Sequence, residues 1–186
     1  MSTPTTAEIV MGVKISCDGD IKTLGAAKYV SLEVPSEKYL GFAEISPMSE
    51  RIGMPVLVQQ YAPHPAWKNS QESGVSDNQE VTSLFSDLHP DNFPLAPMRW
   101  QSKINSVYIL RSDRKDLSVQ QAEALCYYCQ FHLADSLQEA SESGKESEKV
   151  KAAAAVNPDN FRAFFAEFKA KKMAEDSSWQ SAVSPI

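Results

Sequence analysis

The sequence predicts an α+β fold, with a mostly antiparallel sheet covered on one face by two C-terminal helices and a long ordered loop in the centre of the chain. Segments with the two-residue period of strands come first, and segments with the period of helices come last. Strands and helices do not alternate regularly, which disfavours a parallel sheet built from crossover units. We expect one domain over residues 1–175 and a loosely held tail over residues 176–186.

Length and composition are those of one globular domain, with 186 residues, 42% hydrophobic and 23% charged. The formal net charge of −6 disfavours a general affinity for nucleic acid or anionic lipid, because no global positive field attracts phosphate. The first residues lack the basic and apolar regions of a signal peptide, and no run of about 18 apolar residues predicts a membrane span. We therefore expect a cytoplasmic protein, with the nucleus as the alternative.

Four segments are expected to be strands. Residues 9–17 have apolar side chains at the odd positions, and residues 28–34 alternate again, so the two could form a hairpin with a long connection. Residues 55–58 form a short apolar run typical of a buried strand. Residues 104–111 are rich in β-formers and predict a central strand that is buried on both faces.

The long central loop is predicted over residues 63–99. It is rich in Pro, Asn, Ser and Asp, but it keeps large apolar side chains that disordered linkers rarely contain. These are Trp67, Leu84, Phe85, Leu88, Phe93 and Leu95. We expect an ordered loop with a short helix near residues 81–88, and loops of this length often act as lids or pocket walls.

The first helix is predicted over residues 118–139. Ser118 and Gln121 have the spacing of a capping box, and apolar residues then recur every three or four positions. The polar residues 141–149 contain Gly144 and are interpreted as a flexible connection.

The second helix is expected to begin at Asn157 and Pro158, which are typical of an N-cap followed by the first helical position. One aromatic stripe follows, at Phe161, Phe164, Phe165 and Phe168. Trp179 is the expected anchor of the tail.

Several stretches resemble a family of fungal proteins of uncharacterised function, some of which have a MYND-type zinc finger elsewhere in the chain. They are residues 46–58, Asp77-Asn78-Gln79, residues 97–129 and residues 157–172. The family has no assigned activity, so the resemblance implies no catalytic residues. Three cysteines and three histidines cannot form the two tetrahedral zinc sites of that finger, and we predict no metal site.

Cys126, Cys129 and His132 have the spacing C-x-x-C-x-x-H, which suggests a metal or redox site. On a capped helix, the two cysteines stay on the apolar face while His132 turns toward its edge. We therefore favour core packing, and we expect these cysteines and Cys17 to be free thiols.

Two histidines on the predicted loop are candidate acid–base residues. His64 lies between two prolines near Trp67, and His89 could pair with Asp77 or Asp87, whose carboxylate would orient the imidazole. The competing interpretation, which we favour for both, is an exposed loop histidine.

The polar run from Asp77 through Asn78 and Gln79 to Glu80 is most simply a turn or a helix N-cap. If it folds inward, these side chains become the polar contacts of a small-molecule site. The basic residues of this half of the chain are interleaved with Asp113 and Asp116, which favours a solvated face over an anion site. They are Arg99, Lys103, Arg111, Arg114 and Lys115.

The chain has no nucleotide-binding, dinucleotide-binding, hydrolase-elbow or zinc-protease motif, and we predict no cofactor. The first hypothesis is a binding or accessory domain, whose partner is a small molecule or a protein, with a surface on residues 63–100. Its aromatic contacts would be Trp67, Phe85, Phe93 and Trp100. The second is a small cofactor-independent enzyme, an isomerase, lyase or cyclase, with His64, His89 and Asp77 as catalytic residues. The oligomeric state stays open.

Overall fold

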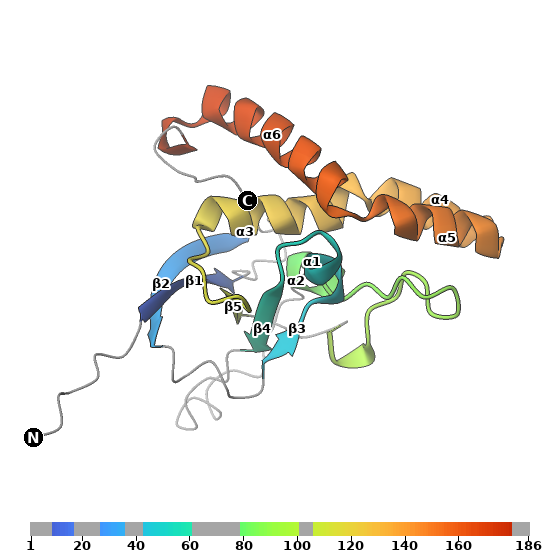
Figure 1. Ribbon diagram of the computed structural model, residues 1–186, viewed down its shortest axis with the longest axis horizontal. Helices are drawn as coiled ribbons and strands as arrows, with labels where there is room; N and C mark the ends of the chain where they lie inside the picture. Colours follow the sequence, from blue (N-terminus) through green and yellow to red (C-terminus); the bar gives the residue numbers. More distant parts are fainter. Residues whose placement is uncertain (1–8, 17–26, 36–42, 61–78, 101–105, 180–186) are drawn as a thin grey trace, which may run out of the picture.

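A computed structural model describes residues 9–16, 27–35, 43–60, 79–100 and 106–179 of the chain. The described strands form one antiparallel sheet in the order β2-β1-β5-β4-β3, and the C-terminal helices lie on one side of it (Figure 1). The predicted α+β fold is therefore confirmed. The strands are β1 (Ile9–Ser16), β2 (Lys28–Pro35), β3 (Glu44–Ile45), β4 (Val56–Gln60) and β5 (Ser106–Arg111).

Strands β1 and β2 pair antiparallel with Ile9 opposite Pro35, as expected for a hairpin. Val13 and Ile15 face the core, but Ile9 is 57% exposed, so the predicted alternation is wrong at the start of the strand. Val10 is instead buried on the opposite face, where it packs with Leu110. The sequence pattern did not predict a second apolar face, because apolar residues of the two faces stand next to each other along the strand.

Strand β5 is central, because it pairs with β1 on one side and with β4 on the other. Ile109 and Leu110 are both buried although they point to opposite faces. The prediction of a central strand that is buried on both faces is therefore confirmed.

A short helix, α1 (Pro47–Arg51), lies between β3 and β4. The Ser46 side chain accepts a hydrogen bond from the Ser49 N–H, and Pro47 occupies the first turn, so this is an ordinary N-terminal cap. The Ser46 hydroxyl also donates to the Leu84 carbonyl, which joins α1 to the segment after α2.

Residues 79–100 form an ordered segment with the short helix α2 (Gln79–Ser83) and the 3-10 turn η3 (Met98–Trp100). Helix α2 begins before the expected range of 81–88 and ends within it, at Ser83. Most apolar residues of this segment enter the core, which confirms that this part of the central loop is ordered, whereas Leu95 and Met98 are exposed. The residues in the core are Val81, Leu84, Phe85, Leu88, Phe93, Ala96 and Trp100.

The predicted helix over residues 118–139 is interrupted. It consists of α3 (Val119–Tyr127), the π-helical turn η4 (Tyr128–His132) and α4 (Ala134–Glu142). The capping box of Ser118 and Gln121 is formed as expected. Cys126 and Leu137, on either side of the turn, are both buried.

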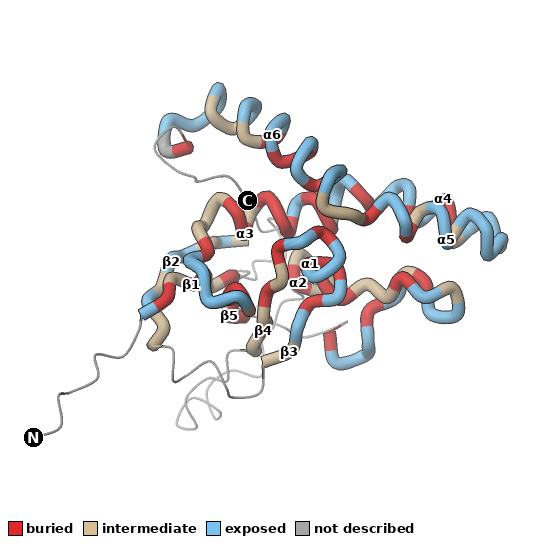
Figure 2. The backbone as a smooth tube through the Cα atoms, in the orientation of Figure 1, coloured by how far each residue is buried: buried red, intermediate tan, exposed pale blue. Residues whose placement is uncertain are grey.

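The prediction of a flexible connection over residues 141–149 is wrong. Helix α4 continues to Glu142, and α5 (Glu146–Ala155) begins after a turn in which Gly144 has a φ of 65°. A single glycine is enough for this reversal, because it adopts the left-handed conformation that ends a helix. The polar residues on either side are the exposed faces of two helices (Figure 2).

Helix α6 (Pro158–Glu175) has the predicted N-cap, because the Asn157 side chain accepts a hydrogen bond from the Asn160 N–H. It lies on the outer side of α3 (Figure 1). Its aromatic stripe packs against Tyr127 at the end of α3 and Tyr128 at the start of η4. Trp179, in the turn η5 (Ser177–Trp179), is buried with its ring 5.5 Å from that of Phe168, as expected for an anchor.

Among the described helices, none is long and apolar enough to cross a membrane.

Candidate functional site

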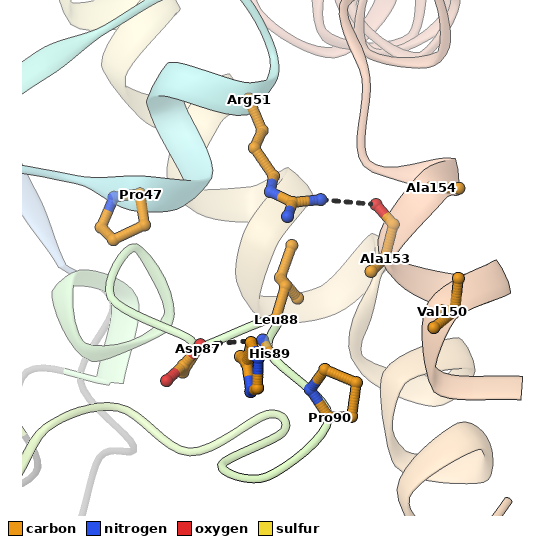
Figure 3. Close-up of a pocket in the computed structure, with 9 residues that line it drawn as sticks. All are labelled: Pro47, Arg51, Asp87, Leu88, His89, Pro90, Val150, Ala153 and Ala154. Atoms are coloured by element: carbon orange, nitrogen blue, oxygen red, sulfur yellow. Dashed lines mark hydrogen bonds between the residues drawn. The ribbon is translucent and has the colours of Figure 1, made fainter. Parts of the chain in front are cut away.

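A hollow of about 470 Å³ lies between α1, α5 and residues 87–90 of the central segment (Figure 3). Most of its wall is apolar, and its polar side chains are few, which is typical of a small-molecule site. The lining residues are Pro47, Arg51, Asp87, Leu88, His89, Pro90, Val150, Ala153 and Ala154.

Arg51 places a positive charge at this hollow. Its side chain extends from the end of α1 toward α5, and Nη1 donates a hydrogen bond of 3.2 Å to the Ala153 carbonyl (Figure 3). A guanidinium has five N–H donors, so this single bond leaves others for a ligand. Planar donors of this kind match the two oxygens of a carboxylate.

Backbone contacts fix the wall that contains His89. The Asp87 N–H donates to the Leu95 carbonyl, and the Asp87 carboxylate accepts a 2.8 Å bond from the His89 N–H. Across the hollow, the Lys149 ammonium of α5 donates to the Pro90 carbonyl at 2.9 Å. The two walls are therefore held together by a hydrogen bond as well as by apolar contact.

The imidazole of His89 does not have the predicted arrangement with Asp87: that carboxylate accepts a hydrogen bond from the His89 backbone N–H, and the imidazole lies near Asp91. Its Nδ1 lies 3.4 Å from the Asp91 carboxylate, and the side chain is 66% exposed. The favoured interpretation of an exposed loop histidine is thus confirmed, but this histidine also lines the hollow.

The other predicted site residues are not brought together by the described structure. His64, Trp67, Asp77 and Asn78 lie outside the described residues, and Gln79 is described only as the first residue of α2. Trp100 is in the core, stacked on Phe85 with ring centroids 3.9 Å apart, and its indole N–H donates to Glu44. In this conformation neither ring face is open to a ligand.

Sequence reasoning missed Arg51 and Val150. The Ser46-Pro47 pair could have indicated the start of a helix that includes Arg51, since serine followed by proline is a common helix start. Val150 is a large apolar residue after a long polar stretch, and it is 54% exposed at the rim of the hollow. Such a residue gives a weak signal, because scattered exposed apolar side chains are common.

Comparisons with known proteins do not identify a function for this hollow. This chain matches no family model, no curated protein and no solved structure. The resemblance to a fungal family therefore stays a prediction, and the function has to be argued from the residues themselves.

Three of the predicted basic residues, Arg99, Arg111 and Lys115, pair with carboxylates. Arg111 binds Asp113 through two hydrogen bonds, and Lys115 lies 3.7 Å from the same carboxylate. Arg99 makes a similar bidentate contact with Glu44. These pairs support the charge-balanced interpretation, but Arg111 itself is buried and not part of a solvated face, and Lys103 lies outside the described residues.

The cysteine pair is buried. Cys126 and Cys129 are free thiols, and burial raises the pKa of Cys129 to about 12, so it is a poor source of thiolate at neutral pH. Within the described ranges, no cluster of three or more His, Cys, Asp or Glu side chains is arranged to hold a metal ion. These observations support a packing role for both cysteines.

A partly buried polar contact joins β2 to α2. The Tyr29 hydroxyl donates to the Glu80 carboxylate, and the Ala27 N–H also donates to Glu80. Burial raises the pKa of Glu80 above its ordinary value of 4.5, and these two hydrogen bonds offset the rise only in part. Burial and the neighbouring Cys126 and Glu80 also raise the pKa of Tyr29.

Replacing Glu80 by Gln is expected to remove part of the pH dependence of stability. Because the folded-state pKa of Glu80 is raised, its protonated form favours the fold, and this contribution is lost as the pH rises above 4.5. The amide stays neutral, so the variant should gain stability relative to the wild type as the pH increases. Urea unfolding from about pH 4.5 to about pH 8 measures the difference.

Glu139→Gln is the matched control, because Glu139 is exposed on α4. Its stability relative to the wild type should not change in the same way over this range. A difference between Glu80→Gln and wild type that is constant with pH would contradict the assignment.

Proposed function

We propose that this protein is a binding domain for a small carboxylate with an apolar body, which occupies the hollow between α1, α5 and residues 87–90. The observation on which the proposal rests is the guanidinium of Arg51 at the edge of a mainly apolar hollow. The volume of about 470 Å³ is within the range of small-molecule sites. The predicted binding surface on the central segment is retained for residues 87–90.

Binding is favoured over acid–base catalysis by the geometry of His89. A catalytic pair needs an imidazole and a carboxylate oriented toward one substrate atom. Here the Asp87 carboxylate is used by a backbone N–H, and the imidazole lies near Asp91 on the exposed side. Cofactor-independent catalysis by His64 and Asp77 stays a prediction, because both lie outside the described residues.

Hexanoate and its uncharged analogue hexanamide test the proposal, with binding followed by amide chemical shifts in NMR. Hexanoate is expected to shift amides of residues 47–51, 87–90 and 150–154, and hexanamide to bind more weakly. Arg51→Gln should weaken hexanoate binding by about tenfold, because a hydrogen bond to a charged group contributes roughly 1.5–3 kcal/mol. Arg162→Gln is the control, since Arg162 is an exposed residue that pairs with Asp159 on α6.

Three outcomes would overturn the proposal. They are equal affinity for hexanoate and hexanamide, shifts located away from the hollow, and no shifts at millimolar hexanoate. His89→Ala separates the two functions, because a ligand site formed mainly by Arg51 and the apolar wall should lose little affinity on this change.

A further inference from the structure

A second hollow, of about 420 Å³, lies between Tyr127 and His132 on one wall and α6 on the other. We call it the aromatic groove. Its α6 wall consists of Phe164, Glu167, Phe168, Lys171, Lys172 and Glu175. None of these residues lines the hollow that contains Arg51, so the two sites are separate.

Aromatic rings form the floor and one side of the groove. The ring of Tyr127 lies 4.9 Å from that of Phe168 and 6.2 Å from that of Phe164. The apolar surface continues to Phe131, whose ring is 4.9 Å from Tyr127. Tyr127 and Phe131 are 40% and 53% exposed, which is unusual for two adjacent aromatic residues.

Carboxylates dominate the charge of the groove. Lys172 is neutralised by Glu123, whose carboxylate lies 2.6 Å from its ammonium. The remaining charges are Glu167, Lys171 and Glu175, which are spaced by four residues along one face of α6. Neither of these two glutamates pairs with another side chain in the described part of the chain, so the groove has a net negative charge.

One cation of the protein, the Lys172 ammonium, already contacts an aromatic ring of the groove. The Lys172 ammonium lies 5.4 Å from the centroid of Phe168, within the distance at which a cation is attracted to an aromatic face. Lys172 is partly exposed and covers only this end of the groove. Tyr127 is 40% exposed, so its ring can make the same kind of contact with a cation from outside, whereas Phe164 is buried beneath it.

We propose that the aromatic groove binds the lysine or arginine side chains of a basic partner peptide. Aromatic faces and free carboxylates together recognise such side chains, and the net charge of −6 draws a basic partner toward the protein. A peptide fits better than a free organic cation, because the groove follows α6 from Phe164 to Glu175, a length of about 16 Å.

Three blocked alanine-based peptides test the proposal, one with three lysines, one with glutamines and one with glutamates in the same places. NMR titration should show that only the lysine peptide shifts amides around Tyr127, Phe131 and Phe168. Glu167→Lys combined with Glu175→Lys should weaken its binding by about tenfold. Lys171→Gln should tighten it, because this change removes the competing ammonium.

The matched control combines Glu33→Lys with Glu139→Lys, which changes the net charge equally at exposed positions outside the groove. This control should retain most of the affinity of the wild type. Phe131→Ser should weaken binding, and because Phe131 is half exposed the protein should still fold, which thermal unfolding verifies. Equal loss of affinity in the control pair, or equal binding of the glutamine peptide, would overturn the proposal.

Discussion

Phe161→Ala is expected to lower the free energy of unfolding by about 3–5 kcal/mol, the usual cost of removing a buried phenylalanine. Phe161 is fully buried in the first turns of α6, and its ring packs edge-on against that of Tyr128 at 5.0 Å. The same ring lies near those of Phe164 and Phe165. Its removal leaves a cavity where α6 joins α3, and the neighbouring rings cannot fill it without leaving their own contacts.

Urea unfolding of the variant measures this loss, and Phe131→Ala is the control. Both changes remove the same atoms, but Phe131 is 53% exposed, so its loss should cost only about 1 kcal/mol or less. Similar values for the two variants would contradict the packing of α6 against α3. A change in the slope of the urea dependence would show that α6 separates before the rest of the domain unfolds.

Gly12→Val is expected to destabilise the fold by about 3 kcal/mol, the upper end of what overpacking usually costs. A Cβ atom at position 12 would lie 2.3 Å from Cδ2 of Leu110 and 2.9 Å from the Ile109 carbonyl oxygen. The Leu110 side chain can rotate away, but the carbonyl belongs to the backbone of β5, the central strand. Strands β1 and β5 must therefore separate locally, which weakens their hydrogen bonds.

Shortening Leu110 distinguishes the two clashes. Gly12→Val combined with Leu110→Ala removes the side-chain clash, but the clash with the backbone carbonyl stays. The double variant should therefore recover only part of the stability, measured by thermal and urea unfolding against Leu110→Ala alone. Complete recovery would show that the close approach of the two backbones does not matter.

Elements with a local cause could be predicted from the sequence. The caps at Ser118 and Asn157 depend on residues three positions away, and both are formed. The hairpin of β1 and β2 and the central position of β5 follow from apolar periodicity. The turn at Gly144 also has a local signal, but the polar residues around it were interpreted as a flexible connection instead of two exposed helix faces.

The site could be predicted only in part. His89 was identified as a candidate, and it does line the hollow, but its proposed partner Asp87 is engaged with the backbone. The burial of Trp100 could not be read from the sequence, because an aromatic residue on a loop packs or stays open depending on its distant neighbours, here Phe85 and Glu44. The described structure does not test His64, Trp67, Asp77 or Asn78.

The sequence by itself determined that strands precede the main helices, the caps at Ser118 and Asn157 and the apolar character of the aromatic stripe on α6, because each depends on residues close along the chain. The tertiary structure alone decided that Arg51 meets Ala153, 102 residues away, and that Tyr29 meets Glu80. It also decided that Val10 and Leu110 share the second face of the sheet. Such contacts depend on how the sheet and helices pack, and no periodicity within one element indicates which distant residue will lie opposite.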